Sequence, residues 1–158
     1  MSRSELLAAL QRHPFFAGLS AEELDCVAGC AQRRDFRAGQ PIIQEGGEAH
    51  HCYALLGGKV AVQTFVPGRG AVSLQTLHGG ELLGWSWLSA PHRWTFDARA
   101  LEETAVAQLD AAPLLRLCEE RPHLGYVLMK NLAHAMAERL RATRLQVLDV
   151  YGAPGARR

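Results

Sequence analysis

The sequence predicts a mixed α+β protein, mainly β, in which a barrel or sandwich of short strands lies between N-terminal helices and a long C-terminal helix. Most of the 15 glycines fall between residues 33 and 110, where apolar residues alternate in short runs at near-regular spacing. This is the pattern of half-buried strands in a barrel or sandwich. Before and after that stretch, apolar residues recur every three or four positions, which is the period of an α-helix.

Residues 4–31 are expected to form the N-terminal helices. An apolar set follows Ser4 and is interrupted at His13-Pro14. The segment Ser20-Ala21-Glu22-Glu23 has the sequence of a capping box, in which the serine hydroxyl and the second glutamate satisfy each other's backbone amides. A second helix is therefore expected to begin there.

Residues 33–110 are expected to form the strands. Residues 52–56 and 59–62 are each typical of a strand, and Gly57-Gly58 between them predicts a two-residue turn that tolerates positive φ. The segment 67–70, Pro-Gly-Arg-Gly, predicts the next turn. Alternation at 96–100 and again at 105–109 predicts the last strands.

Residues 111–151 are expected to form a short helix around 114–118 and a long helix from Pro122 to about Tyr151. At 1.5 Å per residue, nearly 30 residues span about 43 Å, which is more than a small barrel needs for cover. The apolar side is therefore expected to pair with a second copy in a homodimer, although a helix folded wholly back on its own barrel stays open. That side carries Met129, Leu132, Met136, Leu140, Thr143, Val147 and Val150. Residues 152–158 are expected to be a disordered tail.

The composition narrows the class of protein. With 48% apolar and 21% charged residues among 158, the chain does not have the composition of a disordered protein. Its formal charge of +1 gives no broad positive electrostatic field that would attract a polyanion such as a nucleic acid. It has no apolar run of the roughly 20 residues that span a membrane, and its polar start is unlike a signal peptide. We therefore expect a soluble cytoplasmic protein without a membrane partner. No nucleophile motif, Walker loop or pair of facing carboxylates stands out, so we expect no enzyme.

Three stretches of the chain together carry a family resemblance. They are Gly39, Ile42, Glu45-Gly46, Ala49, Tyr53, Leu55, Gly58, Val60 and Val62 in the first strands, Gly80-Glu81-Leu82-Leu83-Gly84, and Arg99–Glu102 with Val106–Asp110. With the order of helix, barrel and long helix, the chain resembles the cyclic nucleotide-binding domain of Crp/Fnr regulators and kinase regulatory subunits. The resemblance implies one domain over residues 1–151, built on an antiparallel jelly-roll β-barrel (a double-stranded β-helix).

The resemblance also implies a site for a cyclic phosphate. In the family, backbone amides after a segment like Gly80–Gly84 hold the phosphate, an arginine pairs with it, and a glutamate accepts a hydrogen bond from the ribose 2′-OH. This chain has Trp85 in the place of that glutamate and Trp94 in the place of the arginine, while Arg93 stands one residue earlier. The long helix would close over the ligand through Arg139, Leu140 or Thr143. The expected ligand-binding residues are Leu83, Gly84, Trp85, Ser86, Arg93, Trp94, Thr95 and Thr143.

The expected function is that of a small-ligand sensor that binds cAMP or another anionic nucleotide-like ligand and signals through its C-terminal helix. Because Trp85 cannot accept a hydrogen bond from the ribose 2′-OH, a standard cAMP site is weakened, and a site for a different ligand is an alternative. The resemblance implies no resident cofactor. Since family members that act on transcription continue into a helix-turn-helix, and only residues 152–158 follow the long helix here, no direct DNA binding is expected.

Two alternatives to the sensor stay open. In the first, the three tryptophans fill the pocket and the domain is a ligand-free scaffold for a protein partner. In the second, His78 holds a haem, or Cys26 and Cys30 with other ligands form a metal or redox site.

Overall fold

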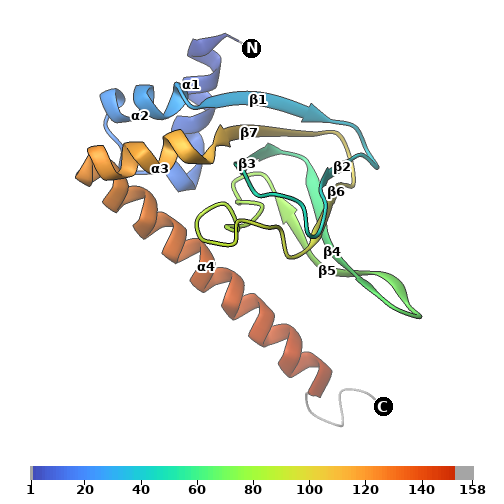
Figure 1. Cartoon of the computed structure of the whole chain (residues 1–158). Coiled ribbons are helices and arrows are strands. Elements are labelled where there is room, and N and C mark those ends of the chain that lie inside the picture. The colour runs from blue at the N-terminus through green and yellow to red at the C-terminus, as the bar shows by residue number, and fades with distance from the viewer. Residues whose placement is uncertain (1, 152–158) are drawn as a thin grey trace.

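A computed structural model gives the structure of the protein and describes residues 2–151. The expected mixed α+β fold with a long C-terminal helix is confirmed (Figure 1). The helices are α1 (Arg3–Arg12), the 3₁₀ helix η1 (Pro14–Phe16), α2 (Ala21–Ala28), α3 (Ala111–Glu120) and α4 (Pro122–Tyr151). The strands are β1 (Ala31–Phe36), β2 (Pro41–Ile43), β3 (His51–Gly57), β4 (Lys59–Val66), β5 (Gly70–His78), β6 (Asp97–Ala100) and β7 (Thr104–Asp110). The tail expected at 152–158 lies outside the described residues.

Capping boxes fix the starts of both N-terminal helices. At α2 the Ser20 hydroxyl accepts a hydrogen bond from the Glu23 amide at 3.1 Å, and the Glu23 carboxylate accepts one from the Ser20 amide at 2.9 Å. The same motif starts α1, where Ser2 pairs with Glu5. The first helix therefore begins before Ser4, because a side chain that can close a capping box is available two residues earlier.

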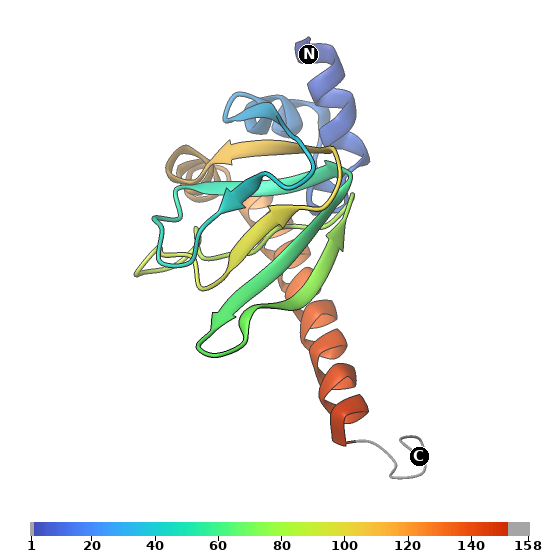
Figure 2. The same cartoon turned by 90° about the vertical axis from the view of Figure 1, so that its right-hand side faces the viewer.

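The strands form two antiparallel sheets, one in the order β1-β7-β3 and the other in the order β2-β6-β4-β5 (Figure 2). Each sheet turns one face toward the other, and the buried residues of β3, β4 and β7 fill the space between them. β4 and β5 form a true hairpin around the turn expected at 67–70.

The turn expected at Gly57-Gly58 has a different role from the one predicted. β3 pairs with β7, and β4 pairs with β5 and β6, so the two strands around this turn are not partners in a hairpin. The chain passes there from one sheet to the other. Gly58 has a φ of +95°. A Cβ at Gly58 would lie 2.6 Å from both the Glu103 carbonyl oxygen and the Thr104 Cα. Both the backbone conformation and the close approach of β7 therefore require glycine.

α4 is anchored to the domain through its first half. Leu124, Leu128 and Leu132 are buried in the core, and the Asn131 side-chain amide donates hydrogen bonds to the carbonyl oxygens of Phe15 (2.8 Å) and Ala17 (2.9 Å). The second half extends past the barrel (Figure 1). Several large apolar side chains are exposed on it, namely Met136, Leu140, Leu145, Val147, Leu148 and Val150.

Within residues 2–151, no helix combines the length and the apolar character that a membrane span requires.

Candidate functional site

A cavity of about 310 Å³ lies between the segment 84–86, the sheet of β4 and β5, and the middle of α4. We call it the Trp85 cavity. Five of the eight predicted binding residues line it: Gly84, Trp85, Ser86, Thr95 and Thr143. The remaining lining residues are Val62, Leu74, Gln75, Phe96, Arg139 and Gln146.

The other three predicted residues do not line this cavity. Leu83 is fully buried, and its amide donates to the Tyr53 carbonyl oxygen at 3.0 Å, which fixes the segment in front of Gly84. Trp94 is buried against Tyr53 and Phe96. Arg93 is exposed, and its guanidinium donates to the Gly46 carbonyl oxygen at 3.1 Å.

The backbone explains why Arg93 turns outward. Residues 93 and 94 run antiparallel to residues 46–48, with a bridge between Glu48 and Arg93 and hydrogen bonds that join Trp94 to Gly46 and Gly47. Because successive side chains of an extended segment point to opposite sides, the burial of Trp94 forces Arg93 toward solvent.

The three tryptophans have different roles. Trp87 is 1% exposed and donates from its indole nitrogen to the Gly84 carbonyl oxygen at 2.9 Å, so it belongs to the core together with Trp94. Trp85 alone of the three lines the cavity, where it is half-buried. Gly84 is held closely between these groups, because a Cβ there would lie 2.9 Å from the Phe96 ring.

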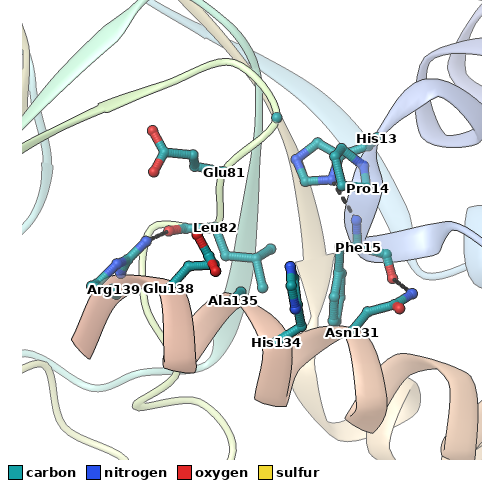
Figure 3. A pocket seen from close by; sticks show the side chains of 11 residues that line it. His13, Pro14, Phe15, Glu81, Leu82, Asn131, His134, Ala135, Glu138 and Arg139 are labelled. Atoms are coloured by element: carbon teal, nitrogen blue, oxygen red, sulfur yellow. Dashed lines mark hydrogen bonds between the residues drawn. The ribbon is translucent and has the colours of Figure 1, made fainter. Parts of the chain in front are cut away.

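Arg139 supplies the positive charge of the Trp85 cavity. Its guanidinium donates to the Leu82 carbonyl oxygen at 2.5 Å (Figure 3) and lies 4.8 Å from the centre of the Trp85 ring, a cation–π contact. Burial lowers the pKa of Arg139, and the nearby Glu81 carboxylate acts in the opposite direction. The family resemblance implies that Arg139 closes over the ligand, but it places the phosphate at Arg93, which the structure shows to lie outside the cavity. Position 139 falls two helical turns after the buried Leu132, and this spacing is the signal that places it on the inner face of α4.

The remaining polar groups of the cavity are neutral. Gln75 and Gln146 each carry an amide that can donate and accept, and the Thr143 hydroxyl donates to the Arg139 carbonyl oxygen at 2.9 Å. Within residues 2–151, the backbone amides of Gly84, Trp85 and Ser86 donate to no protein acceptor, and the hydroxyls of Ser86 and Thr95 make no hydrogen bond. No aspartate or glutamate lines the cavity, so Arg139 is its one charged lining residue among those described. This arrangement suits an anion with a flat apolar part that contacts Trp85 and Phe96.

The residues of the alternative haem, metal or redox sensor do not converge on one site. In the part of the chain from 2 to 151, no three histidine, cysteine or acidic residues lie close enough together to hold a metal ion. The His78 backbone amide donates to the Glu81 carboxylate at 2.7 Å, and the His78 ring lies 3.7 Å from the same carboxylate. Burial raises the pKa of Cys30, which disfavours its reactive thiolate.

Comparison with known proteins adds three kinds of similarity. Residues 33–121 match the family described as the cyclic nucleotide-binding domain. The chain is 32% identical over 144 residues to the cyclic AMP receptor protein of Thermus thermophilus, covering 91% of this chain and 64% of that protein. It therefore spans less than two thirds of the length of this curated relative.

Solved structures agree in fold. A cyclic nucleotide-binding protein from Geobacter metallireducens is 29% identical with a TM-score of 0.74, covering 89% of this chain and 98% of that one. A cyclic nucleotide-binding domain from Methylobacillus flagellatus has a TM-score of 0.79 at 20% identity, covering 93% and 83%.

Proposed function

Because the chain belongs to the cyclic nucleotide-binding domain family, which confirms the resemblance inferred from its sequence, we propose that it is a cytoplasmic regulatory domain, not an enzyme, that binds a small anionic ligand in the Trp85 cavity. The observation that carries this proposal is the lining of that cavity. It combines the Arg139 guanidinium, unpaired amide and hydroxyl donors and an indole face, and it contains no carboxylate.

Binding would change the partner of Arg139. In the structure its guanidinium donates to a neutral carbonyl oxygen, that of Leu82. The guanidinium is charged in both cases, but a phosphate or carboxylate adds the attraction between opposite charges and can accept two parallel hydrogen bonds from it. A phosphate or carboxylate at the amides of Gly84–Ser86 would therefore draw Arg139 away from Leu82, and α4 would move with it. This is the route by which occupancy would be signalled.

Recognition of the ribose gives a direct test of the ligand class. cAMP and its 2′-deoxy analogue are expected to bind with affinities within about tenfold of each other, because no carboxylate lines the cavity and a neutral acceptor such as Gln75 or Gln146 contributes only about 0.5–1.5 kcal/mol. Isothermal titration calorimetry with both nucleotides measures this ratio. A preference for cAMP of about a hundredfold would contradict the prediction, since it requires a charged acceptor for that hydroxyl.

Dimerisation through α4 is the second part of the proposal. Met136, Leu140, Val147 and Val150 are exposed at intervals of three, four or seven residues, which is the spacing of a coiled-coil seam. The groove between Trp85 and α4 is lined by Met136, Leu140 and Thr143, so a second copy paired along this seam would also cover Trp85. Ligand occupancy and dimer geometry would then affect each other directly.

The double variant Leu140→Glu, Val147→Glu is expected to be a monomer at about 100 µM, a concentration at which the unchanged protein is expected to be a dimer. Each aliphatic side chain buried in an interface contributes about 1.5–3 kcal/mol, and the substitution also brings like charges together. Light scattering after size exclusion measures the mass. Leu145→Glu is the matched control, because Leu145 is equally exposed but lies on the far side of the helix and should leave the dimer intact.

The ligand-free scaffold is the competing function, and two observations favour it. Trp94 fills core space where the family places the phosphate-binding arginine, and Arg93 points away from the cavity. Calorimetry separates the two functions. If millimolar cyclic nucleotides give no heat, and no small anion is found with the purified protein by mass spectrometry, the scaffold is the better account.

A further inference from the structure

The walls of the Trp85 cavity are mostly apolar, and two of them are aromatic. Val62 is 5% exposed, and the half-buried Phe96 ring lies so close to Gly84 that a Cβ at this glycine would be 2.9 Å from it. The half-buried Trp85 indole and the more exposed Leu74 complete these walls. A flat aromatic ring placed among these side chains would be taken out of water without leaving a polar group of its own unpaired.

The positive charge of the cavity is held against one of the aromatic walls. The Cζ atom of Arg139 lies 4.8 Å from the centre of the Trp85 ring, and the guanidinium reaches from α4 to the Leu82 carbonyl oxygen (Figure 3). A carboxylate pairs with a guanidinium in one plane, through two parallel hydrogen bonds. A ring conjugated with that carboxylate stays close to the same plane. The charge and the ring of one flat molecule can therefore meet Arg139 and the apolar walls together.

We propose that the ligand of the Trp85 cavity is an aromatic carboxylate, in which the negative charge is attached directly to a flat ring. This inference rests on the proposed function and names the chemical class of its small anion. A single negative charge is expected, because Arg139 is the one charged residue that lines the cavity in the described part of the chain. The free amides of Gly84–Ser86 would donate to the carboxylate lone pairs that the guanidinium leaves unused.

A sugar between the ring and the charge is disfavoured in this cavity. Trp85 stands where the family has the glutamate that accepts the ribose 2′-OH, and an indole has no acceptor. The neutral amides of Gln75 and Gln146 are the acceptors that remain among the side-chain amides of the lining, and Gln146 is exposed to solvent. A ribose would therefore give up bound water for at most a neutral hydrogen bond, whereas a bare aromatic ring has no such bond to lose.

Four probes separate the contributions of charge, flatness and sugar. 2-Naphthoate has a flat ring and a carboxylate, and 2-naphthamide has the same ring without the charge. Decahydro-2-naphthoate has the charge on a puckered ring, and cAMP has a ribose between its base and its charge. 2-Naphthoate is expected to bind about tenfold or more tightly than each of the other three. Isothermal titration calorimetry at neutral pH measures the four affinities on the unchanged protein.

Trp85→Leu tests the aromatic wall, because leucine keeps an apolar side chain but removes the flat face. The substitution is expected to weaken 2-naphthoate about fivefold more than it weakens decahydro-2-naphthoate. A purely structural role of Trp85 would affect both anions equally. Phe65→Leu is the matched control and should change neither affinity, since Phe65 is a 65% exposed aromatic residue of β4 that does not line the cavity.

The outcomes distinguish this inference from the proposed function. The aromatic carboxylate is wrong if 2-naphthoate binds no more tightly than 2-naphthamide or decahydro-2-naphthoate, or if Trp85→Leu affects the two anions equally. If cAMP binds more tightly than 2-naphthoate, the inference fails and the proposed function stands. If none of the three anions binds, the proposed function fails with it.

Discussion

Replacing Arg139 with alanine is expected to weaken cAMP binding by about tenfold to a hundredfold. The guanidinium is the one charged group that lines the Trp85 cavity in the described part of the chain, and a charge-assisted hydrogen bond contributes about 1.5–3 kcal/mol. Arg139→Lys should recover only part of the loss, because an ammonium cannot reproduce the planar fork of donors or its stacking on Trp85. Isothermal titration calorimetry with cAMP measures both effects.

Two further arginines serve as controls for this experiment. Arg141 is exposed two residues along the same helix, so Arg141→Ala removes the same charge from the opposite side of α4 and should leave affinity unchanged. Arg93→Ala should also change affinity by less than about twofold, since that guanidinium donates to Gly46 outside the cavity. If Arg93→Ala abolishes binding and Arg139→Ala does not, the loop at 89–95 must refold around the ligand and the assignment to Arg139 is wrong.

Gly58→Ala is expected to destabilise the fold by about 2–5 kcal/mol. A residue with a side chain loses about 1–2 kcal/mol in the left-handed backbone conformation of Gly58, and crowding of a packed site costs about 1–3 kcal/mol more. The crowding arises because the added Cβ would meet the backbone of Glu103 and Thr104, which cannot rotate away as a flexible side chain can. Urea denaturation followed by circular dichroism measures the change in the free energy of unfolding.

Gly68→Ala separates the two contributions. Gly68 also has a positive φ, +84°, but a Cβ there would meet nothing within 4 Å. It should therefore lose only the 1–2 kcal/mol or so of backbone strain. Equal losses in the two variants would show that the approach of β7 to Gly58 does not constrain the corner between the sheets.

Features that depend on neighbours in sequence could be predicted well. The apolar period and the Arg121-Pro122 break predict a long helix from Pro122, where α4 begins. The capping box at Ser20–Glu23 is formed as its spacing indicates. Both signals act within a few residues of the chain, so no knowledge of distant contacts is needed to interpret them.

Strand pairing could not be predicted in this way. The segments around Gly57-Gly58 have the local pattern of a hairpin, and that pattern is the same whether the second strand returns beside the first or crosses to another sheet. The partner of the second strand is decided by contacts between distant parts of the chain. These are the burial of β3 and β4 on facing sheets and the contact of Gly58 with Thr104, 46 positions later. The family resemblance supplied the jelly-roll arrangement that the local pattern lacked.

The site was predicted in part for a similar reason. Segment 84–86 and Thr143 line the cavity as predicted. Trp94 is buried and Arg93 is exposed, whereas a phosphate-binding role requires the arginine to point inward. The outcome depends on which of two adjacent side chains packs against Tyr53, and sequence distance carries no information about that choice. Arg139 was within reach through its helical spacing from Leu132, but that signal is equally compatible with a purely structural role.

The way α4 is attached to its domain gives it the mechanics of a lever. Asn131 is the fulcrum, held by two carbonyl oxygens of the N-terminal segment. In the proposed function the ligand would act on Arg139, about 12 Å farther along the axis, and the last turn of the helix lies about 30 Å from the fulcrum. A displacement of 1 Å at the guanidinium would thus become about 2.5 Å at the tip. If the proposed ligand binds, a movement this small at Arg139 would therefore displace most strongly the exposed apolar side chains of the last turns, on which the proposed dimer depends.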